Sequence, residues 1–179
     1  MRLRRSVYAA EDNNEDMPAR INVQTASPEI VGYLQEGSKL LAKSGLDQDT
    51  ITLIELRASQ INRCAFCLAL HTREARARGE TDDRIVGLSA WREAPWYGER
   101  ERLALEWTEA LTLVSTSHRT VDDVRARLKE HFSDREIAYL TLAVTTINTW
   151  NRFSIGFANP PEEAERVFHA LHAMAASHS

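Results

Sequence analysis

No hydrophobic run in this 179-residue sequence approaches the ~20 residues that a helix needs to cross a bilayer. The N-terminus also lacks the apolar stretch of roughly 7–15 residues that a secretory signal requires, because only VYAA separates its basic residues from acidic ones. A net charge of −4 provides no general attraction to nucleic acids or anionic membranes. We therefore expect a cytoplasmic protein that binds neither nucleic acid nor membrane.

Glycine and proline are also scarce, with seven and five residues, and strand-like alternation of apolar and polar residues is hard to find. Apolar residues instead recur at helical spacing, for example from Ile137 to Ile147 at steps of three, four and three residues. Ser133 and Glu136 form a capping-box pattern before this stretch, and Gly79 is typical of a residue just after a helix. The sequence predicts an all-α fold.

The chain is long enough for one domain with a sizeable core, and a second full domain is not indicated. We expect a polar N-terminal extension over residues 1–17 and a single helical domain over residues 18–179, with its central part at about 48–115. Four tryptophans and several strongly amphipathic helices indicate more apolar surface than one core hides. We therefore expect a homo-oligomer.

Cysteine occurs only twice, at Cys64 and Cys67, and His71 follows one helical turn later. In a reducing compartment this C-x-x-C spacing favours metal or redox chemistry over a structural disulfide. If residues 63–78 are helical, the three side chains lie within roughly 60° on one face, and His71 can contact Cys67. Cys64 then lies in the first turn, where free N–H groups favour a thiolate. The pattern offers one attacking sulfur, one resolving sulfur and a nearby base.

Two other interpretations compete with redox chemistry. Zinc would find three ligands in Cys64, Cys67 and His71, but structural zinc normally takes four, and along the helix axis Cys64 and His71 are roughly 10 Å apart. Simple packing is the second alternative, because free cysteine often serves as a small buried apolar residue. We rank redox chemistry first, packing second and zinc third.

The motif ASQINRCAFCLALHTREA resembles the AhpD-like alkylhydroperoxidases of the carboxymuconolactone decarboxylase family, and the similarity extends over about residues 18–160. The resemblance implies an all-helical fold that assembles into trimers or hexamers. It implies that Cys67 attacks a hydroperoxide, that Cys64 resolves the sulfenic acid as a disulfide, and that His71 belongs to a proton relay. No bound cofactor is implied. The electron donor would be an external dithiol of the lipoyl type, and the substrate an organic hydroperoxide or hydrogen peroxide.

Two positions depart from the family pattern. The relay glutamate is expected twelve residues before Cys64, where this chain has Thr52, and a threonine cannot serve as a carboxylate base. Glu55 lies one turn later on the same predicted helix, so we include it as a candidate relay residue, the alternative being a surface glutamate. Some members carry a histidine where this chain has Phe66. These departures leave open a second hypothesis, a redox-responsive binding or stress protein with little peroxidase turnover.

Overall fold

The computed structural model describes residues 21–116 and 118–176, and over these residues it is helical without strands. The prediction of an all-α fold is confirmed. The proposed extension over residues 1–17 lies outside the described residues. The elements are α1 (Val23–Ala26), α2 (Pro28–Ala42), α3 (Gln48–Asn62), α4 (Ala65–Ala77), α5 (Asp82–Gly87), η1 (Leu88–Ala90), α6 (Glu99–Thr112), α7 (His118–His131), α8 (Asp134–Gly156), η2 (Pro161–Glu163) and α9 (Ala164–Ala176).

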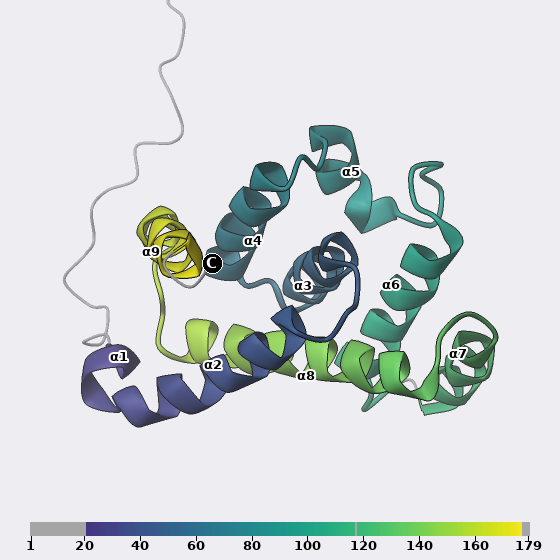
Figure 1. Ribbon diagram of the computed structural model, residues 1–179, viewed down its shortest axis with the longest axis horizontal. Helices are drawn as coiled ribbons and strands as arrows, with labels where there is room; N and C mark the ends of the chain where they lie inside the picture. Colours follow the sequence, from purple (N-terminus) through teal and green to yellow (C-terminus); the bar gives the residue numbers. More distant parts are fainter. Residues whose placement is uncertain (1–20, 117, 177–179) are drawn as a thin grey trace, which may run out of the picture.

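Helix α3 lies at the centre of the molecule, and α4, α6 and α8 all pack against it (Figure 1). Helix α8 runs along one side with α2 beside it, and α9 packs against α4. The largest core cluster joins α3, α6, α7 and α8 through side chains such as Ile54, Trp107, Leu128 and Leu140. A second cluster packs α3 against η1 around Leu53, Leu88 and Leu105. The C-x-x-C segment therefore follows directly from the most buried helix.

Local sequence signals account for the ends of these elements. The Ser133 hydroxyl accepts a hydrogen bond from the Glu136 N–H at 3.2 Å, and the Glu136 carboxylate accepts one from the Ser133 N–H at 2.8 Å, so the capping box is present. Gly79 adopts φ +92° just after α4, as its position predicts. From Ile137 to Ile147 the periodic residues turn toward the core. These three sequence predictions are confirmed.

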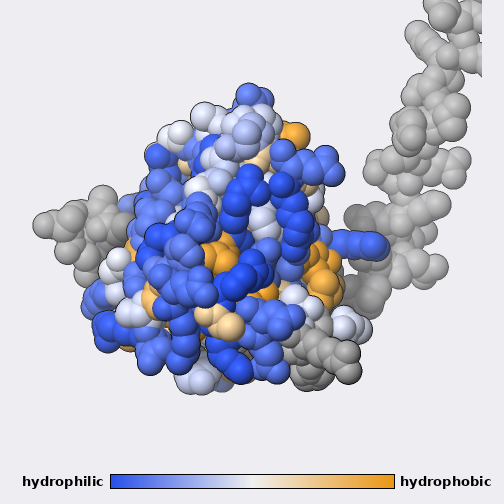
Figure 2. Space-filling view, turned by 90° about the vertical axis from the view of Figure 1, so that its right-hand side faces the viewer, coloured by the Kyte–Doolittle hydropathy of each residue, from blue (hydrophilic) through white to orange (hydrophobic). Residues whose placement is uncertain are grey.

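The surface is largely hydrophilic on the face turned toward the viewer in Figure 2, where hydrophobic residues appear as small separate patches. Some large hydrophobic side chains are exposed to solvent, notably Tyr33 and Leu40 of α2 and Ile155 of α8. Among the described residues, no helix combines the length and the apolar character needed to cross a membrane.

Candidate functional site: a cysteine pair and a Glu-His-Glu cluster

Cys64 lies between α3 and α4 and contributes to the end of the first helix and to the start of the second. Helix α3 ends with Arg63 in the left-handed conformation at φ 58°, and the Cys64 N–H donates to the Ser59 carbonyl at 3.0 Å, which gives a Schellman-type helix end. The Cys64 Sγ then accepts a hydrogen bond from the Cys67 N–H at 3.3 Å and caps α4. Our prediction of a helix over residues 63–78 is therefore wrong at its start. The left-handed Arg63 breaks it, and Cys64 is the N-cap rather than a first-turn residue.

The two cysteines form a disulfide across a Cα–Cα distance of 5.3 Å, within the usual range for such a bond. Both are deeply buried, with 1% of Cys64 and 3% of Cys67 exposed. The sulfur of Cys64 sits where unpaired N–H groups begin α4, so a thiolate there is stabilised after reduction. A bulky reductant must displace part of the surrounding structure before it can reach either sulfur.

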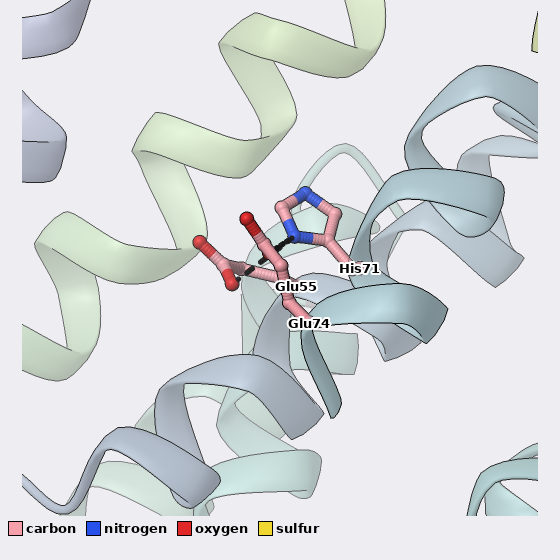
Figure 3. Close-up of side chains that lie close together, drawn as sticks. All are labelled: Glu55, His71 and Glu74. Carbon is pink, nitrogen blue, oxygen red and sulfur yellow. Dashed lines mark hydrogen bonds and ion pairs between the residues drawn. The ribbon is translucent and has the colours of Figure 1, made fainter. Parts of the chain in front are cut away.

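His71 lies between two carboxylates, Glu55 from α3 and Glu74 from α4 (Figure 3). Its Nδ1 is 2.6 Å from an oxygen of Glu74 and 3.3 Å from an oxygen of Glu55. We call these three residues the Glu-His-Glu cluster. The sequence-derived candidates Glu55 and His71 are thus brought together, whereas Glu74 was missed. Its position three residues after His71, on the same helical face, was the signal that could have found it.

The electrostatics of the Glu-His-Glu cluster separate the roles of its members. Burial raises the pKa of Glu55 to about 7, since the charge of His71 only partly offsets the desolvation and Glu74 adds repulsion. Burial by itself lowers the pKa of His71, but the charge of Glu55 and the hydrogen bond and charge of Glu74 outweigh it and raise that pKa to about 9. At neutral pH the ring is therefore an imidazolium, and Glu55 is the member that titrates close to neutrality.

An open cavity of about 210 Å³ adjoins the cluster and is lined by Glu55, Glu74, Thr52 and, from α9, His172. The Thr52 hydroxyl donates to the Gln48 carbonyl at 3.0 Å, so it is held in the helix and carries no charge. Neither cysteine lines this cavity. It brings solvent to the carboxylate end of the cluster and leaves the disulfide covered.

In the disulfide state no hydrogen bond joins Cys67 and His71, two residues that the structure describes fully. Their predicted i, i+4 relation holds, since both lie in α4 and both are buried. The closed disulfide orients the Cys67 sulfur toward Cys64. A direct contact with the imidazole therefore requires that the disulfide open, and in the closed state a water molecule is needed to bridge the two groups.

Among the described residues, the Glu-His-Glu cluster is the group whose ligand atoms lie close enough to hold a metal ion, all within 4.8 Å of one another. The zinc set considered from the sequence, Cys64, Cys67 and His71, differs from this group. In the disulfide the two sulfurs are bonded to each other, so neither is available as a thiolate ligand.

Comparison with known proteins places the chain in a family. A model of the carboxymuconolactone decarboxylase family matches residues 28–110. The chain is also 38% identical over 143 residues to the uncharacterised protein YdfG of Bacillus subtilis (strain 168), an alignment that covers 80% of this chain and 97% of YdfG. This chain belongs to the carboxymuconolactone decarboxylase family.

Solved structures link this member of the carboxymuconolactone decarboxylase family to its AhpD-like branch. ATU0492 of Agrobacterium tumefaciens, a protein of unknown function for which the name antioxidant defence protein AhpD has been suggested, is 42% identical, with a TM-score of 0.76 over 80% of this chain and 97% of its own. An uncharacterised peroxidase-related protein from Silicibacter sp. TM1040 is 23% identical, with a TM-score of 0.64 over 76% of this chain and 74% of its own, which shows the fold alone. The resemblance noted from the sequence is confirmed.

Proposed function

We propose that this AhpD-like protein is a thiol peroxidase that reduces organic hydroperoxides or hydrogen peroxide. The observation that carries the proposal is the Cys64–Cys67 disulfide at the start of the helix that also bears His71 and Glu74. A C-x-x-C cysteine pair beside an acid–base cluster supplies the two functions that peroxide reduction needs. These are a nucleophilic thiolate and a proton donor for the leaving alkoxide.

The reaction balances in three steps. The Cys67 thiolate attacks the terminal oxygen of ROOH, the O–O bond breaks, and the alkoxide takes a proton to leave as ROH, with a sulfenic acid left on Cys67. The Cys64 thiolate then attacks the sulfur of that sulfenic acid and the disulfide forms. The displaced hydroxide takes a proton and leaves as water. An external dithiol then reduces the disulfide and is itself oxidised to a disulfide.

Each member of the Glu-His-Glu cluster has a role suited to its charge. The imidazolium of His71, one turn after Cys67, stabilises the Cys67 thiolate in the reduced protein. Glu55 has a pKa raised to about 7 and lines the solvent cavity. It therefore exchanges protons with water and acts as the general acid and base. Glu74 holds the imidazole in place through the 2.6 Å contact with Nδ1.

The N-cap position of Cys64 fits a resolving cysteine. Backbone N–H groups at the start of α4 stabilise negative charge on its sulfur, and a resolving cysteine must attack as a thiolate. The same stabilisation makes Cys64 the better leaving group when an external dithiol attacks the Cys67 sulfur. We expect that dithiol to be of the lipoyl type, in a cytoplasmic setting.

Assembly into a homo-oligomer, a trimer or a hexamer, is part of this proposal. Tyr33 and Leu40 of α2 are 79% and 52% exposed, which leaves large apolar side chains for contact with a second copy. Light scattering at micromolar concentration tests this part, and a monomer under those conditions contradicts it.

The chemical proposal is tested by counting thiols before and after one equivalent of an organic hydroperoxide. We expect both thiols of the reduced protein to disappear as one equivalent of ROH forms. Cys67→Ser should abolish peroxide consumption, whereas Cys64→Ser should still react once and accumulate a sulfenic acid that a dimedone adduct reveals. Survival of both wild-type thiols rejects the peroxidase, and the opposite pattern in the two variants exchanges the roles of the cysteines.

The burial of the disulfide favours one competing function, a redox-responsive binding protein with little turnover. A disulfide with 1% and 3% of its cysteines exposed is poorly placed for rapid exchange with a donor. Steady-state peroxide reduction with a lipoyl-type dithiol separates the two functions. Turnover at several cycles per protein supports the peroxidase, and a single slow cycle followed by a change in assembly supports the alternative.

A further inference from the structure

A partly buried hydrogen-bonded network lies against the turn that carries Cys64. The Asn62 side-chain N–H groups donate to the amide oxygens of Asn148 and Asn151, at 2.9 and 2.8 Å. The Asn151 amide donates to the Ser59 hydroxyl at 2.9 Å, and the Asn148 amide donates to the Thr112 hydroxyl at the same distance. These five residues, which we call the asparagine network, join α3, α6 and α8.

Two members of the network occupy buried positions where apolar side chains would ordinarily pack. Ser59 and Asn151 are both 0% exposed, and a buried amide is destabilising unless its partners are held in place. Replacing a buried polar pair by apolar groups of similar shape is often neutral for stability. Stability alone therefore gives little reason for these polar residues, whereas the fixed geometry of a satisfied network does.

The network contacts the redox turn at two points. Ser59 accepts from Asn151 through its hydroxyl, and its backbone carbonyl accepts the Cys64 N–H at 3.0 Å. Asn62 is the last residue of α3 and directly precedes the left-handed Arg63. Two residues of α3 that lead into the Schellman-type turn are thus anchored to α8, the long helix that packs against α3.

We propose that Ser59, Asn62 and Asn151 are positioning residues that set how strongly the Cys64–Cys67 disulfide is favoured. They hold the Cys64 backbone at the N-cap of α4, so that its sulfur stays within bonding reach of Cys67 in the dithiol form. Two thiols held in one geometry close a disulfide with a higher effective concentration than two mobile ones. The inference deepens the proposed peroxidase, because closure and reopening of this bond are two of its steps.

The test measures the disulfide equilibrium directly, in the full chain and without peroxide. The protein is equilibrated in glutathione buffers, in which two glutathione thiols reduce the disulfide to two cysteine thiols and become one glutathione disulfide. Alkylation and mass spectrometry then give the fraction of dithiol protein. Ser59→Ala removes the hydroxyl that links Asn151 to the turn, and Thr112→Val is the matched control, because it cuts the arm of the network that leads away from the turn.

We expect the equilibrium constant for disulfide formation to fall about tenfold in Ser59→Ala, or about 30 mV for this two-electron couple. Thr112→Val should change it less than about twofold, even if both variants lose similar thermal stability. Asn62→Ala, at a half-buried position, is the second variant if Ser59→Ala does not fold, and the same fall is expected. An unchanged constant in Ser59→Ala or Asn62→Ala overturns the inference, and so does an equal fall in Thr112→Val.

This readout is independent of peroxide chemistry. If the wild-type protein fails to consume peroxide while Ser59→Ala still shifts the glutathione equilibrium, the proposed function fails and the positioning role stands. If peroxide is consumed normally but the equilibrium does not move, the peroxidase stands and the positioning role fails.

Discussion

Glu74 approaches the Nδ1 of His71 to 2.6 Å, closer than Glu55, whose nearest oxygen lies 3.3 Å away. The ring N–H therefore donates to Glu74, a residue of the same helix, and the carboxylate from α3 interacts with the ring mainly through its charge. This division leaves Glu55 free to exchange its proton with the cavity while Glu74 keeps the imidazole oriented.

The first prediction concerns the titration of His71. In Glu74→Gln the ring loses a negative charge that raises its pKa, so the pKa of His71 should fall below about 9, and that of Glu55 below about 7 because repulsion by Glu74 is removed. NMR titration of the imidazole measures the first effect. The second effect is measured in the pH profile of the rate of peroxide consumption, whose acid limb should shift to lower pH. Glu36→Gln, an exposed position on α2, is the control, and a wild-type titration in Glu74→Gln contradicts the assignment.

The second prediction is that the free energy of unfolding decreases as pH rises toward 9. Folded His71 keeps its proton up to about pH 9, whereas an unfolded histidine loses it near 6.5, so this contribution is complete below pH 6.5 and is lost through pH 9. Folded Glu55 also holds a proton that the unfolded chain releases near 4.5, so its ionisation near pH 7 acts in the same direction. Urea unfolding at pH 6.5, 7.5 and 9 measures the slope. It should flatten in the double variant Glu55→Gln/His71→Asn, which lacks both groups, and a stability that increases over this range would reject the account.

The third prediction concerns Arg63, which adopts φ 58° at the end of α3. A side chain in this left-handed region is disfavoured by roughly 1 kcal/mol relative to glycine, so Arg63→Gly should raise the free energy of unfolding by up to about that amount. Gly79→Ala is the converse control, because Gly79 has φ +92° after α4 and the variant should lose about 1 kcal/mol. Denaturant unfolding measures both, and a destabilised Arg63→Gly would mean that the arginine side chain contributes to folding.

The fourth prediction tests the core. Leu140 of α8 is 0% exposed and belongs to the largest core cluster, so Leu140→Ala should cost about 2–5 kcal/mol through lost burial and a residual cavity. Leu40→Ala on α2, where 52% of the leucine is exposed, should cost below about 1 kcal/mol in the monomer. Comparable losses in the two variants at low protein concentration would contradict the packing described for α8.

Periodicity and capping residues were sufficient to predict helix α8, because their signals are local. Ser133 and Glu136 lie three residues apart, and the buried stripe from Ile137 repeats at helical spacing. The break at Arg63 was not predictable in the same way, since an arginine gives no indication of a left-handed conformation that glycine would have signalled. Ser59 and Asn62, which precede that turn, are instead held by tertiary hydrogen bonds to Asn151, far away in the sequence.

The candidate site was predicted in part. Cys64, Cys67 and His71 share one short segment, so their proximity follows from sequence spacing alone. Glu55 depends on how α3 packs against α4, a tertiary relation that the sequence did not specify, and Glu74 has the appearance of an ordinary helix-surface glutamate. The asparagine network spans 89 residues between Asn62 and Asn151, and no local pattern connects its members.

The cap formed by Cys64 has a practical consequence for mutagenesis of this protein. Serine is among the best N-cap residues, and its hydroxyl can accept the Cys67 N–H that the sulfur now accepts. Alanine at the same position leaves that N–H without its acceptor and weakens the start of α4 by about 1 kcal/mol. A Cys64→Ser protein therefore loses the disulfide without losing the helix, and any difference between the serine and alanine variants reports helix initiation rather than sulfur chemistry.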